Sequence, residues 1–470
     1  MRIWSRLQAA LLIFLTAPAA YAALPAPVLA ALKRAAIPPS AVGVQVQDIE
    51  SGRILLALNP SLPLNPASTM KLVTTDAALE LLGPTYSFAT QVFTRGTRSG
   101  DQLHGDLILR GSGDPKLVIE NFWLLLRKIR AQGVRVIHGN LLLDRAAFAS
   151  VPNDPAQFDG DPLKPYNAAP DALLLNYHAL AVNFLPDLAR GTVQVRIDPV
   201  LYNYAVRAPQ LVQGPCNADW RQAIGAQFGV SSSAFDGDFA ASCTEKSWEI
   251  HPYQLSPNRY FELVFRQLWS ELGGTLEGAV GDGLVGGDAT LLTQWDSATL
   301  PELIRDTNKF SNNVMARQLF LALSGGVPPA SIDASRAAVT RWLVTKGIDP
   351  SALVLENGAG LSRTERVSAA LLSQLLVAAF ASPVMPEFIS SLPLVGYDGT
   401  MQKRLRDQSV AGHAHIKSGS LQEVRSIAGY VLAASGRRYT VVFLINHPNA
   451  ARGGEAQDEL LQWVYAMRPE

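Results

Sequence analysis

The sequence lacks several features that define common classes of protein. It carries no excess charge, because 40 basic side chains balance 40 acidic ones over 470 residues. Without a basic excess it is not a dedicated nucleic-acid binder. Only 17% of its residues are charged and 48% are apolar, which excludes intrinsic disorder. Cysteine is scarce too, and two cysteines without clustered histidines cannot complete a tetrahedral zinc shell. We therefore expect a folded protein with no metal site and no nucleic-acid partner.

The two cysteines are Cys216 and Cys243. Two cysteines at this range usually pair in an oxidising compartment, where closing the loop would stabilise the fold by roughly 3–4 kcal/mol. The alternative is a pair of unpaired buried thiols. We expect a disulfide.

Long apolar runs are also missing, except near the N-terminus. A short apolar stretch at residues 9–17 follows two arginines and precedes Ala20-Tyr21-Ala22, a small-x-small cleavage pattern. This pattern is typical of a secretory signal peptide at residues 1–22. The alternative is an uncleaved membrane anchor, but the apolar stretch is too short to span a bilayer comfortably. Polar residues interrupt the stretch at 367–385, which is predicted to be a buried helix. We expect an exported, periplasmic protein with no membrane span after cleavage.

What the chain does contain is a series of regular patterns. Alternating apolar residues at 41–58 predict a β-hairpin, and an apolar helix follows at 68–82. Residues 104–109 and 138–143 resemble each other and flank an amphipathic helix at 117–132. This arrangement predicts a strand–helix–strand crossover in a separate α/β module.

The second half of the chain changes character twice. Residues 190–260 hold short β-like runs with many turn residues, which predicts a β-rich unit. Helical periods return after about residue 300, two strands are predicted within 426–446, and a last helix is predicted at 456–467. At about 150 residues per domain, the length agrees with roughly three units.

Ser68-Thr69-Met70-Lys71 is the one S-x-x-K in the chain, at the start of the predicted helix. Residues three apart lie on one helix face, so the lysine amine can reach the serine hydroxyl. Serine is a weak nucleophile until a base takes its proton, and lysine can be that base when burial and nearby cations lower its pKa. Alone the motif is weak, because an ordinary exposed helix start can also carry it.

Two further motifs follow in order. Ser311-Asn312-Asn313 gives S-x-N before an apolar helix, and Lys417-Ser418-Gly419 gives K-S-G in a strand-rich section. Ser256-Pro257-Asn258 is a second S-x-N, but the surroundings of Ser311 fit a helix-opening loop better. The order S-x-x-K, S-x-N, K-[ST]-G is that of the serine β-lactamase and penicillin-binding superfamily.

The chain resembles one branch of that superfamily, the low-molecular-mass, class C type of penicillin-binding protein, a D-alanyl-D-alanine carboxypeptidase that is also an endopeptidase. The long gap between Ser68 and Ser311 is typical of the domains inserted in this family. Further matching stretches are residues 109–117, 166–178, 356–368 and 398–405.

The resemblance implies a mixed α/β (α+β) fold. A β-lactamase- or transpeptidase-like catalytic domain, with an antiparallel sheet flanked by helices, would be interrupted by two modules, one α/β and one β-rich. The implied boundaries are 23–83 with 295–470 for the catalytic domain, 84–165 with 262–294 for the α/β module, and 166–261 for the β-rich module.

The resemblance also implies a role for each motif residue. Ser68 would be the nucleophile and Lys71 its base. Ser311 would relay a proton, and Asn313 would orient the substrate amide. Lys417 would supply a fixed positive charge near the substrate carboxylate.

Further residues are assigned to substrate binding in the same way. Ser418 and Ser420 would offer hydroxyls, and the Ser420 N–H would complete an oxyanion hole with that of the nucleophile. Gly419 would let the edge strand pass close to the nucleophile. Asp144 would reach over the cleft to the amino end of a diaminopimelate side chain, the alternative being a plain strand-end turn residue. Arg363 would help to bind the stem peptide, the alternative being a surface salt bridge.

The implied substrates are peptidoglycan stem peptides ending in D-Ala-D-Ala and their diaminopimelate crosslinks. The chemistry needs no metal and no organic cofactor, and β-lactam antibiotics would act as inhibitors that acylate the nucleophile. Two alternatives stay open at this point. One is a β-lactamase or esterase of the same fold, and the other is a catalytically silent cell-wall binding protein.

Overall fold

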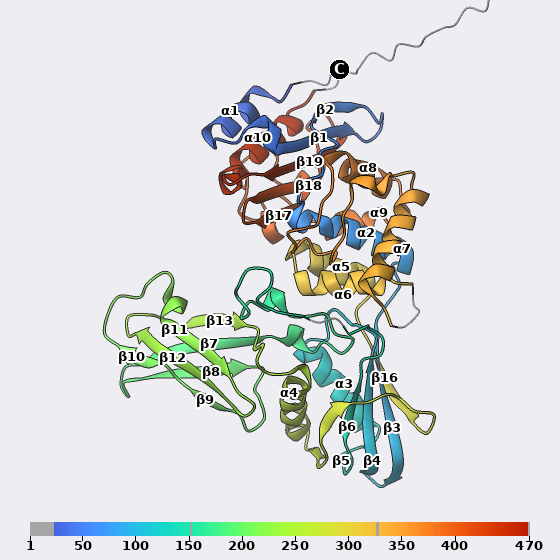
Figure 1. The fold of residues 1–470 in the computed structure, drawn as a ribbon, viewed down its shortest axis with the longest axis vertical. Coiled ribbons are helices and arrows are strands. Elements are labelled where there is room, and N and C mark those ends of the chain that lie inside the picture. Colours follow the sequence, from blue (N-terminus) through green and yellow to red (C-terminus); the bar gives the residue numbers. More distant parts are fainter. Residues whose placement is uncertain (1–22, 151–152, 326–328, 469–470) are drawn as a thin grey trace, which may run out of the picture.

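The computed structural model describes residues 23–150, 153–325 and 329–468. The predicted signal peptide lies outside these ranges. The molecule is elongated, with one group of sheet and helices built from both ends of the chain and the intervening residues below it (Figure 1). No helix within the described ranges is both long and apolar enough to cross a bilayer.

A five-stranded antiparallel sheet forms the upper part of the molecule. Its order is β17-β18-β19-β1-β2, so β17 is an edge strand. The strands are β1 (Val42–Asp48), β2 (Ile54–Leu58), β17 (Ala414–Leu421), β18 (Val424–Leu432) and β19 (Arg438–Asn446). The β1–β2 hairpin confirms the prediction at 41–58, and the β18–β19 pair confirms the strands predicted within 426–446.

Helices cover both faces of this sheet because its strands are apolar on both sides. On β19, Val441 and Phe443 pack into one core, and Val442 and Leu444 pack into the other. Side chains alternate along a strand, so the two sets face opposite ways, and each buried side chain contributes about 1.5–3 kcal/mol. The covering helices are α1 (Ala26–Arg34) and α10 (Gly454–Tyr465) on the first face, and α2 (Lys71–Leu82) and α8 (Ala369–Phe380) on the second.

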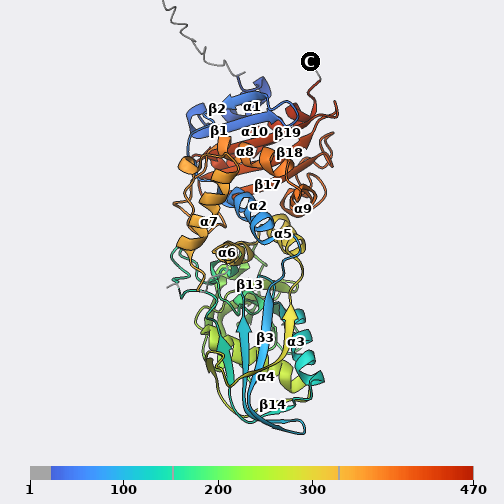
Figure 2. The ribbon, with the colours of Figure 1, turned by 90° about the vertical axis from the view of Figure 1, so that its right-hand side faces the viewer.

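The remaining helices of this part surround α2. They are α5 (Leu300–Lys309), α6 (Asn313–Ala322), α7 (Ile332–Thr345) and α9 (Met385–Ser391). Figure 2 shows α2 between the sheet and α5, with α6 facing the lower half of the molecule. The α2 helix is therefore enclosed, and its residues from Lys71 to Leu79 are buried.

A second, mixed sheet lies in the lower part. Its members are β3 (Ala89–Ser99), β4 (Gln102–Gly111), β5 (Val136–Ile137), β6 (Leu141–Asp144), β14 (Thr275–Leu276), β15 (Val280–Asp282) and β16 (Thr290–Asp296), with α3 (Ile119–Ala131) and α4 (Pro257–Glu271) beside it. β4 and β6 are parallel neighbours joined through α3, which confirms the predicted crossover.

The two similar stretches of sequence are brought side by side in this sheet. The His104 and His138 rings stack with centroids 4.5 Å apart. A Cβ on Gly139 would lie 2.4 Å from the carbonyl oxygen of Gly105, so only glycine allows the approach. Gly278, in front of β15, packs against Gly139 in the same way, and this third copy of the pattern was not predicted from the sequence.

The chain enters and leaves the lower part through adjacent strands. β3 and β16 are antiparallel neighbours, with Ala89 opposite Asp296. Ser297, directly after β16, donates its backbone N–H at 2.9 Å to the carbonyl of Phe88, directly before β3. The chain therefore leaves the upper part after residue 88 and returns to it at residue 297, and the two crossings lie side by side.

The third group of strands is a β-rich unit, seen at the left of Figure 1. It comprises β7 (Leu180–Asp187), β8 (Thr192–Asp198), β9 (Ala205–Arg207), β10 (Gln210–Val212), β11 (Ile224–Phe228), β12 (Ser232–Ala240) and β13 (Lys246–Ile250). α4 follows it and packs against the mixed sheet. Because α4 begins at Pro257, the boundary expected between residues 261 and 262 falls inside this helix.

Cys216 and Cys243 form a disulfide within the β-rich unit, as expected. Replacing both with serine should lower the free energy of unfolding of this unit by roughly 3 kcal/mol, because the unfolded loop regains its freedom. Thermal denaturation with and without reductant would measure the change. The two cysteines are distant in sequence from the three motifs, so a loss of activity at a temperature where the double variant stays folded would contradict this purely structural role.

Candidate active site

Ser68 and Lys71 lie where a 3-10 turn (Ala67–Met70) runs into α2. The Lys71 Nζ donates to Ser68 Oγ at 2.9 Å, as the i, i+3 spacing predicts. Ser68 is only partly buried, whereas the Lys71 side chain is fully enclosed. A reachable hydroxyl and an enclosed amine are what a nucleophile and its base require.

Two other groups share the Lys71 amine. Nζ lies 2.6 Å from Asn313 Oδ1 and 2.5 Å from the Ala359 carbonyl oxygen. Burial, followed by the positive charge of Lys417, holds the pKa of Lys71 well below its usual value, although the negative charge of Glu365 acts the other way. A neutral Lys71 amine has a lone pair that can accept the Ser68 proton.

The S-x-N motif sits in a tight bend before α6. Ser311 has a left-handed backbone, φ 57°, and Asn312 caps the helix by accepting the Met315 N–H at 3.0 Å. Asn313 is the first residue of α6, and its side-chain oxygen accepts a hydrogen bond from the Lys71 amine. The other S-x-N is elsewhere: Ser256 is the N-cap of α4 and accepts a backbone N–H of that helix.

The K-S-G motif lies on the edge strand β17. The Lys417 Nζ donates to Ser311 Oγ at 2.9 Å and to the Ser418 carbonyl at 3.0 Å. The Ser418 hydroxyl contacts that of Thr400 at 2.7 Å, and Ser420 is exposed. Lys417 is fully buried, which lowers its pKa to about 7. The three motifs, distant in sequence, thus meet around one serine hydroxyl.

Close backbone approach requires glycine on β17. A Cβ on Gly419 would lie 2.8 Å from the Ser68 nitrogen, 2.8 Å from the Pro66 carbonyl and 2.2 Å from Ser426 Oγ. Such distances are below normal contact, so any other residue would push the strand away from the nucleophile. β17 therefore runs directly alongside Ser68.

A loop at residues 356–365 completes the site, although no catalytic role was predicted for it from the sequence. The Ala359 carbonyl oxygen accepts a hydrogen bond from the Lys71 amine. Gly360 has φ 77°, and a Cβ there would lie 1.8 Å from the Ala67 carbonyl oxygen. The buried Glu365 holds the loop, because its Oε1 accepts three successive backbone N–H groups, the last from Gly358 at 2.9 Å. The G-x-G sequence at 358–360 was the available signal.

Arg363 projects from the outer side of this loop. Its guanidinium lies 4.8 Å from the centre of the Phe158 ring, and its Nη1 is 3.4 Å from the Gln422 carbonyl. Gln422 follows the end of β17. Arg363 is exposed and makes no ion pair with another described residue, so the surface salt bridge is not seen.

The structure does not bring Asp144 to these residues. It ends β6 and is 4% exposed, and its carboxylate accepts the backbone N–H groups of Ala146 at 3.1 Å and Val285 at 3.0 Å. Both oxygens therefore hold loops of the mixed sheet. This corrects the expectation that Asp144 reaches over the cleft, and it agrees with the strand-end alternative.

An acyl-transferring serine hydrolase of the penicillin-binding type is the class that this fold and this site define. The model of the D-Ala-D-Ala carboxypeptidase 3 (S13) family matches residues 25–467, and the chain belongs to that family. This confirms the resemblance drawn from the three motifs, and it makes the protein a hydrolase.

Curated relatives and solved structures agree with this membership. A D-alanyl-D-alanine carboxypeptidase of Actinomadura sp. is 29% identical over 431 residues, which cover 87% of this chain and 78% of that protein. The D-alanyl-D-alanine carboxypeptidase DacB of Haemophilus influenzae is 27% identical, covering 87% and 85%. Penicillin binding protein 4 of H. influenzae has the same fold, with a TM-score of 0.78 at 23% identity over 94% of this chain and 99% of that one.

Proposed function

We propose that the protein releases the terminal D-alanine of peptidoglycan stem peptides through an acyl-enzyme on Ser68. The observation that carries the proposal is the position of the Lys71 amine, which is hydrogen-bonded both to Ser68 Oγ and to Asn313 Oδ1. A simple exposed helix start would not bury a lysine against a serine and an asparagine. A silent binding protein would have no use for a lysine with a lowered pKa.

Acylation begins when Ser68 Oγ attacks the carbonyl carbon of the penultimate D-alanine. Its proton passes to Lys71, and the carbonyl oxygen becomes an oxyanion that the N–H groups of Ser68 and Ser420 would stabilise. Collapse breaks the C–N bond, and the proton that Lys71 took from Ser68 passes to the leaving amine by way of the Ser311 hydroxyl, which is hydrogen-bonded to Lys417. Lys71 is thereby neutral again. The products are free D-alanine and the Ser68 ester.

Deacylation repeats the same steps with water. The neutral Lys71 amine takes a proton from a water molecule that attacks the ester carbonyl, and the proton then returns to Ser68 Oγ as the ester C–O bond breaks. The terminal carboxylate of the peptide selects the substrate beforehand, through the charge of Lys417 and the hydroxyl of Ser418. Asn313 faces the same space and would hold the amide of the acyl side.

A crosslinked peptide presents the same bond. In the crosslink the D-alanine carbonyl is joined to the amine at the D-centre of diaminopimelate, which also carries a carboxylate. The acylation steps need no change, so we include DD-endopeptidase activity in the proposal. Predatory endopeptidases of Bdellovibrio bacteriovorus share the fold, one of them with a TM-score of 0.56 at 16% identity.

Labelled penicillin tests the acyl-enzyme. Its strained amide should acylate the nucleophile, and peptide mapping of the adduct should place the label on Ser68. Release of D-alanine from a stem pentapeptide, and of monomers from crosslinked muropeptides, would establish the two activities. A β-lactamase or esterase would instead turn the antibiotic over rapidly, and a silent binding protein would release no D-alanine.

We further propose that the protein works outside the cytoplasm, in a periplasm. The pattern at residues 1–22 is typical of export, and a disulfide is most often formed in an oxidising compartment. The substrate is also found there. Fractionation of cells that carry the full chain would test this, and the N-terminal residue of the recovered protein should be Ala23.

The pH profile tests the role of Lys417. Its pKa is lowered to about 7, and an amine is cationic only below its pKa, so binding of the peptide carboxylate should be lost as pH rises through about 7. We expect kcat/KM for D-alanine release to decline on the alkaline side. Lys417→Arg should shift that decline to higher pH, because a guanidinium stays charged. A kcat/KM that keeps rising to about pH 10, the usual lysine pKa, would contradict this role.

A further inference from the structure

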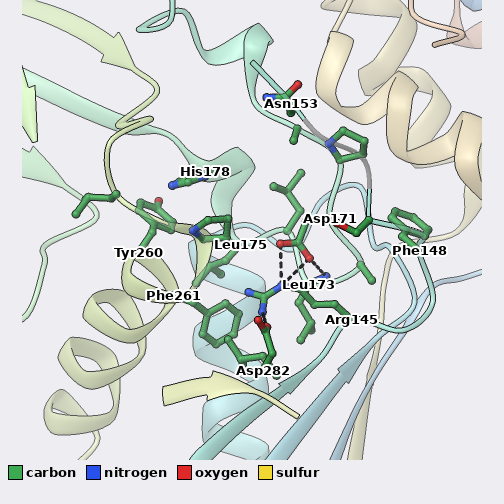
Figure 3. Close-up of a pocket in the computed structure, with 18 of the residues that line it drawn as sticks. Arg145, Phe148, Asn153, Asp171, Leu173, Leu175, His178, Tyr260, Phe261 and Asp282 are labelled. Atoms are coloured by element: carbon green, nitrogen blue, oxygen red, sulfur yellow. Dashed lines mark hydrogen bonds and ion pairs between the residues drawn. The ribbon is translucent and has the colours of Figure 1, made fainter. Parts of the chain in front are cut away.

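A large cavity lies between the mixed sheet and the β-rich unit, apart from the three motifs (Figure 3). Its volume is about 710 Å³, within the range of ~300–1,000 Å³ that small-molecule sites occupy. Its walls are the ends of β6 and β15, the start of α4, residues 169–175 and the segment that follows β13. None of the motif residues lines it, so the catalytic steps give it no role.

Aromatic rings line much of this cavity. Tyr260 and Phe261 approach it from α4, and Phe148 lies on the opposite side (Figure 3). Tyr253 also lines it and is 38% exposed, so this ring lies at the rim. The face of an aromatic ring is electron-rich and attracts the C–H groups of a ligand that lies flat against it. The cavity therefore suits a ligand with flat apolar faces.

Two buried histidines supply hydrogen-bonding groups without charge. His251 Nδ1 lies 2.8 Å from the His178 carbonyl oxygen, and because a carbonyl only accepts, this nitrogen carries the ring proton. Burial lowers the pKa of His251, so its ring is neutral and Nε2 is left as an acceptor. His178 is 8% exposed, and its enclosed Nε2 has no hydrogen-bond partner among the described residues. An enclosed polar atom without a partner is unfavourable, so a ligand that bonds to it is favoured.

The backbone that presents His178 is strained. Asn176, Tyr177 and His178 are three consecutive residues in the left-handed region, with φ of 48°, 56° and 48°. For residues other than glycine this conformation costs about 1–2 kcal/mol each. Strain of this kind clusters at binding and active sites, where the surrounding structure holds it in place. The strained turn thus fixes the unpartnered His178 ring at the cavity wall.

The charged groups of the cavity are already matched. Arg145 pairs with Asp171 at 2.8 Å and with Asp282 at 2.5 Å, contacts that Figure 3 marks by dashed lines. Among the described residues that line the cavity these three alone are charged, so one cation stands against two carboxylates and an anionic ligand is repelled. The Asp282 side chain is 69% exposed, which leaves its carboxylate able to accept from a neutral ligand.

The wall of the cavity is fastened to helix α6 of the catalytic part. Asp171 donates its backbone N–H to Gln318 Oε1 at 3.0 Å, and Gln318 Nε2 donates to the Asp171 carbonyl at 2.7 Å. Gln318 lies five residues beyond Asn313 on α6, which is about 7.5 Å along the helix axis. Because Asn313 contacts Lys71, a ligand in the cavity would be held at a fixed position relative to the nucleophile.

We propose that this cavity binds an N-acetylated sugar of the glycan strand to which the stem peptides are attached. The inference rests on the proposed function, because it takes peptidoglycan as the substrate. A pyranose ring has flat C–H faces for the aromatic side chains, and its hydroxyl and acetamido groups can donate to His251 Nε2 and Asp282. The sugar carries no charge, which suits a cavity whose cation is already paired. A free stem peptide carries several carboxylates and is disfavoured there.

Calorimetric titration with N,N′-diacetylchitobiose tests the proposal. This neutral disaccharide carries the N-acetylated sugar without peptide, so it offers no bond for Ser68 to cleave. We expect it to bind with the same Kd to the free protein and to the penicillin-acylated protein, because Ser68 does not line the cavity. Absence of binding would overturn the proposal, and so would binding that disappears on acylation, since the sugar would then occupy the catalytic site.

Cellobiose tests the acetamido group. It has the same two rings without that group, and we expect its Kd to be about 3- to 10-fold higher, the effect of one hydrogen bond. Equal Kd values for the two disaccharides would overturn the assignment to an N-acetylated sugar.

Variants then place the sugar in the cavity. Tyr253→Ala removes an exposed ring from the rim and should raise the Kd about 10-fold. Tyr397→Ala, which removes a tyrosine that is 63% exposed and does not line the cavity, is the matched control and should keep the wild-type Kd. Ala146→Trp adds a bulky ring at an exposed position of the wall and should abolish binding. An unchanged Kd in Ala146→Trp would show that the sugar binds elsewhere and would overturn the proposal.

A free stem pentapeptide distinguishes the other part of the substrate. Titrated into the penicillin-acylated protein, it should not bind. Pentapeptide binding that Ala146→Trp removes would make the cavity a peptide site, which also contradicts the proposal.

These outcomes are distinct from a failure of the proposed function. If the protein formed no penicillin adduct and released no D-alanine, the acyl-enzyme would be wrong, whereas titration of the unmodified protein would still report on the cavity. If it formed the adduct and released D-alanine but bound no disaccharide, only the role of the cavity would be wrong.

Discussion

Ser68→Ala is expected to abolish the penicillin adduct and to lower D-alanine release by about 10⁴-fold or more. A triad nucleophile removed from a serine protease has an effect of this size, because only binding and the oxyanion hole remain. The side chain is small and partly exposed, so the substitution opens no cavity and the fold should persist. The measurements are intact-protein mass after incubation with penicillin and D-alanine release from a stem pentapeptide.

Ser61→Ala provides the matched control. Ser61 is an exposed serine in the loop before the 3-10 turn, and it contacts none of the motif residues. Acylation at the wild-type rate is expected. Labelling that survives in Ser68→Ala would show that another residue is the nucleophile and would contradict the proposed mechanism.

Lys71→Met should have the second largest effect, with acylation slowed by about 10³-fold or more. Methionine has a similar length and tolerates burial, but it can neither take the Ser68 proton nor hold the Asn313 and Ala359 oxygens. Stopped-flow acylation by a chromogenic β-lactam would measure the loss. Lys33→Met, an exposed lysine of α1, serves as the control.

A second variant separates the base from the charge. Lys71→Arg keeps a cation at the site but cannot lose its proton, so it should be as slow as Lys71→Met. In the wild type the acylation rate should fall at acid pH, because protonation of Lys71 removes the base, and this fall should come well below the usual lysine pKa. Fast acylation by Lys71→Arg would show that the site needs a positive charge there and no base.

The sequence predicted the parts of the site whose signal is local. Ser68 and Lys71 share one helical turn, so their spacing alone implies contact. Lys417 and Ser311 were found only because their motifs occur in a known order, since nothing in 106 residues of separation indicates that Nζ would lie 2.9 Å from Oγ. The hairpins and the crossover were predicted because alternation and helical period are local properties.

The features that were missed depend on the backbone or on distant partners. Ala359 acts through a carbonyl oxygen, which every residue possesses, so its identity gave no signal. Asp144 was placed over the cleft by the family resemblance alone, and the N–H that engages one of its oxygens belongs to Val285, 141 residues along the chain.

The pairing of β1 with β19 has a consequence for biosynthesis. Val42, near the start, lies opposite Ile445, near the end, and Asn65 and Asn446 exchange hydrogen bonds at 2.7 and 3.0 Å just before the nucleophile. Contacts so distant in sequence form late, since a large loop must close first. A nascent chain therefore exposes Ser68 long before Lys417 and the edge strand exist. The protein becomes able to acylate only when its last strands are in place.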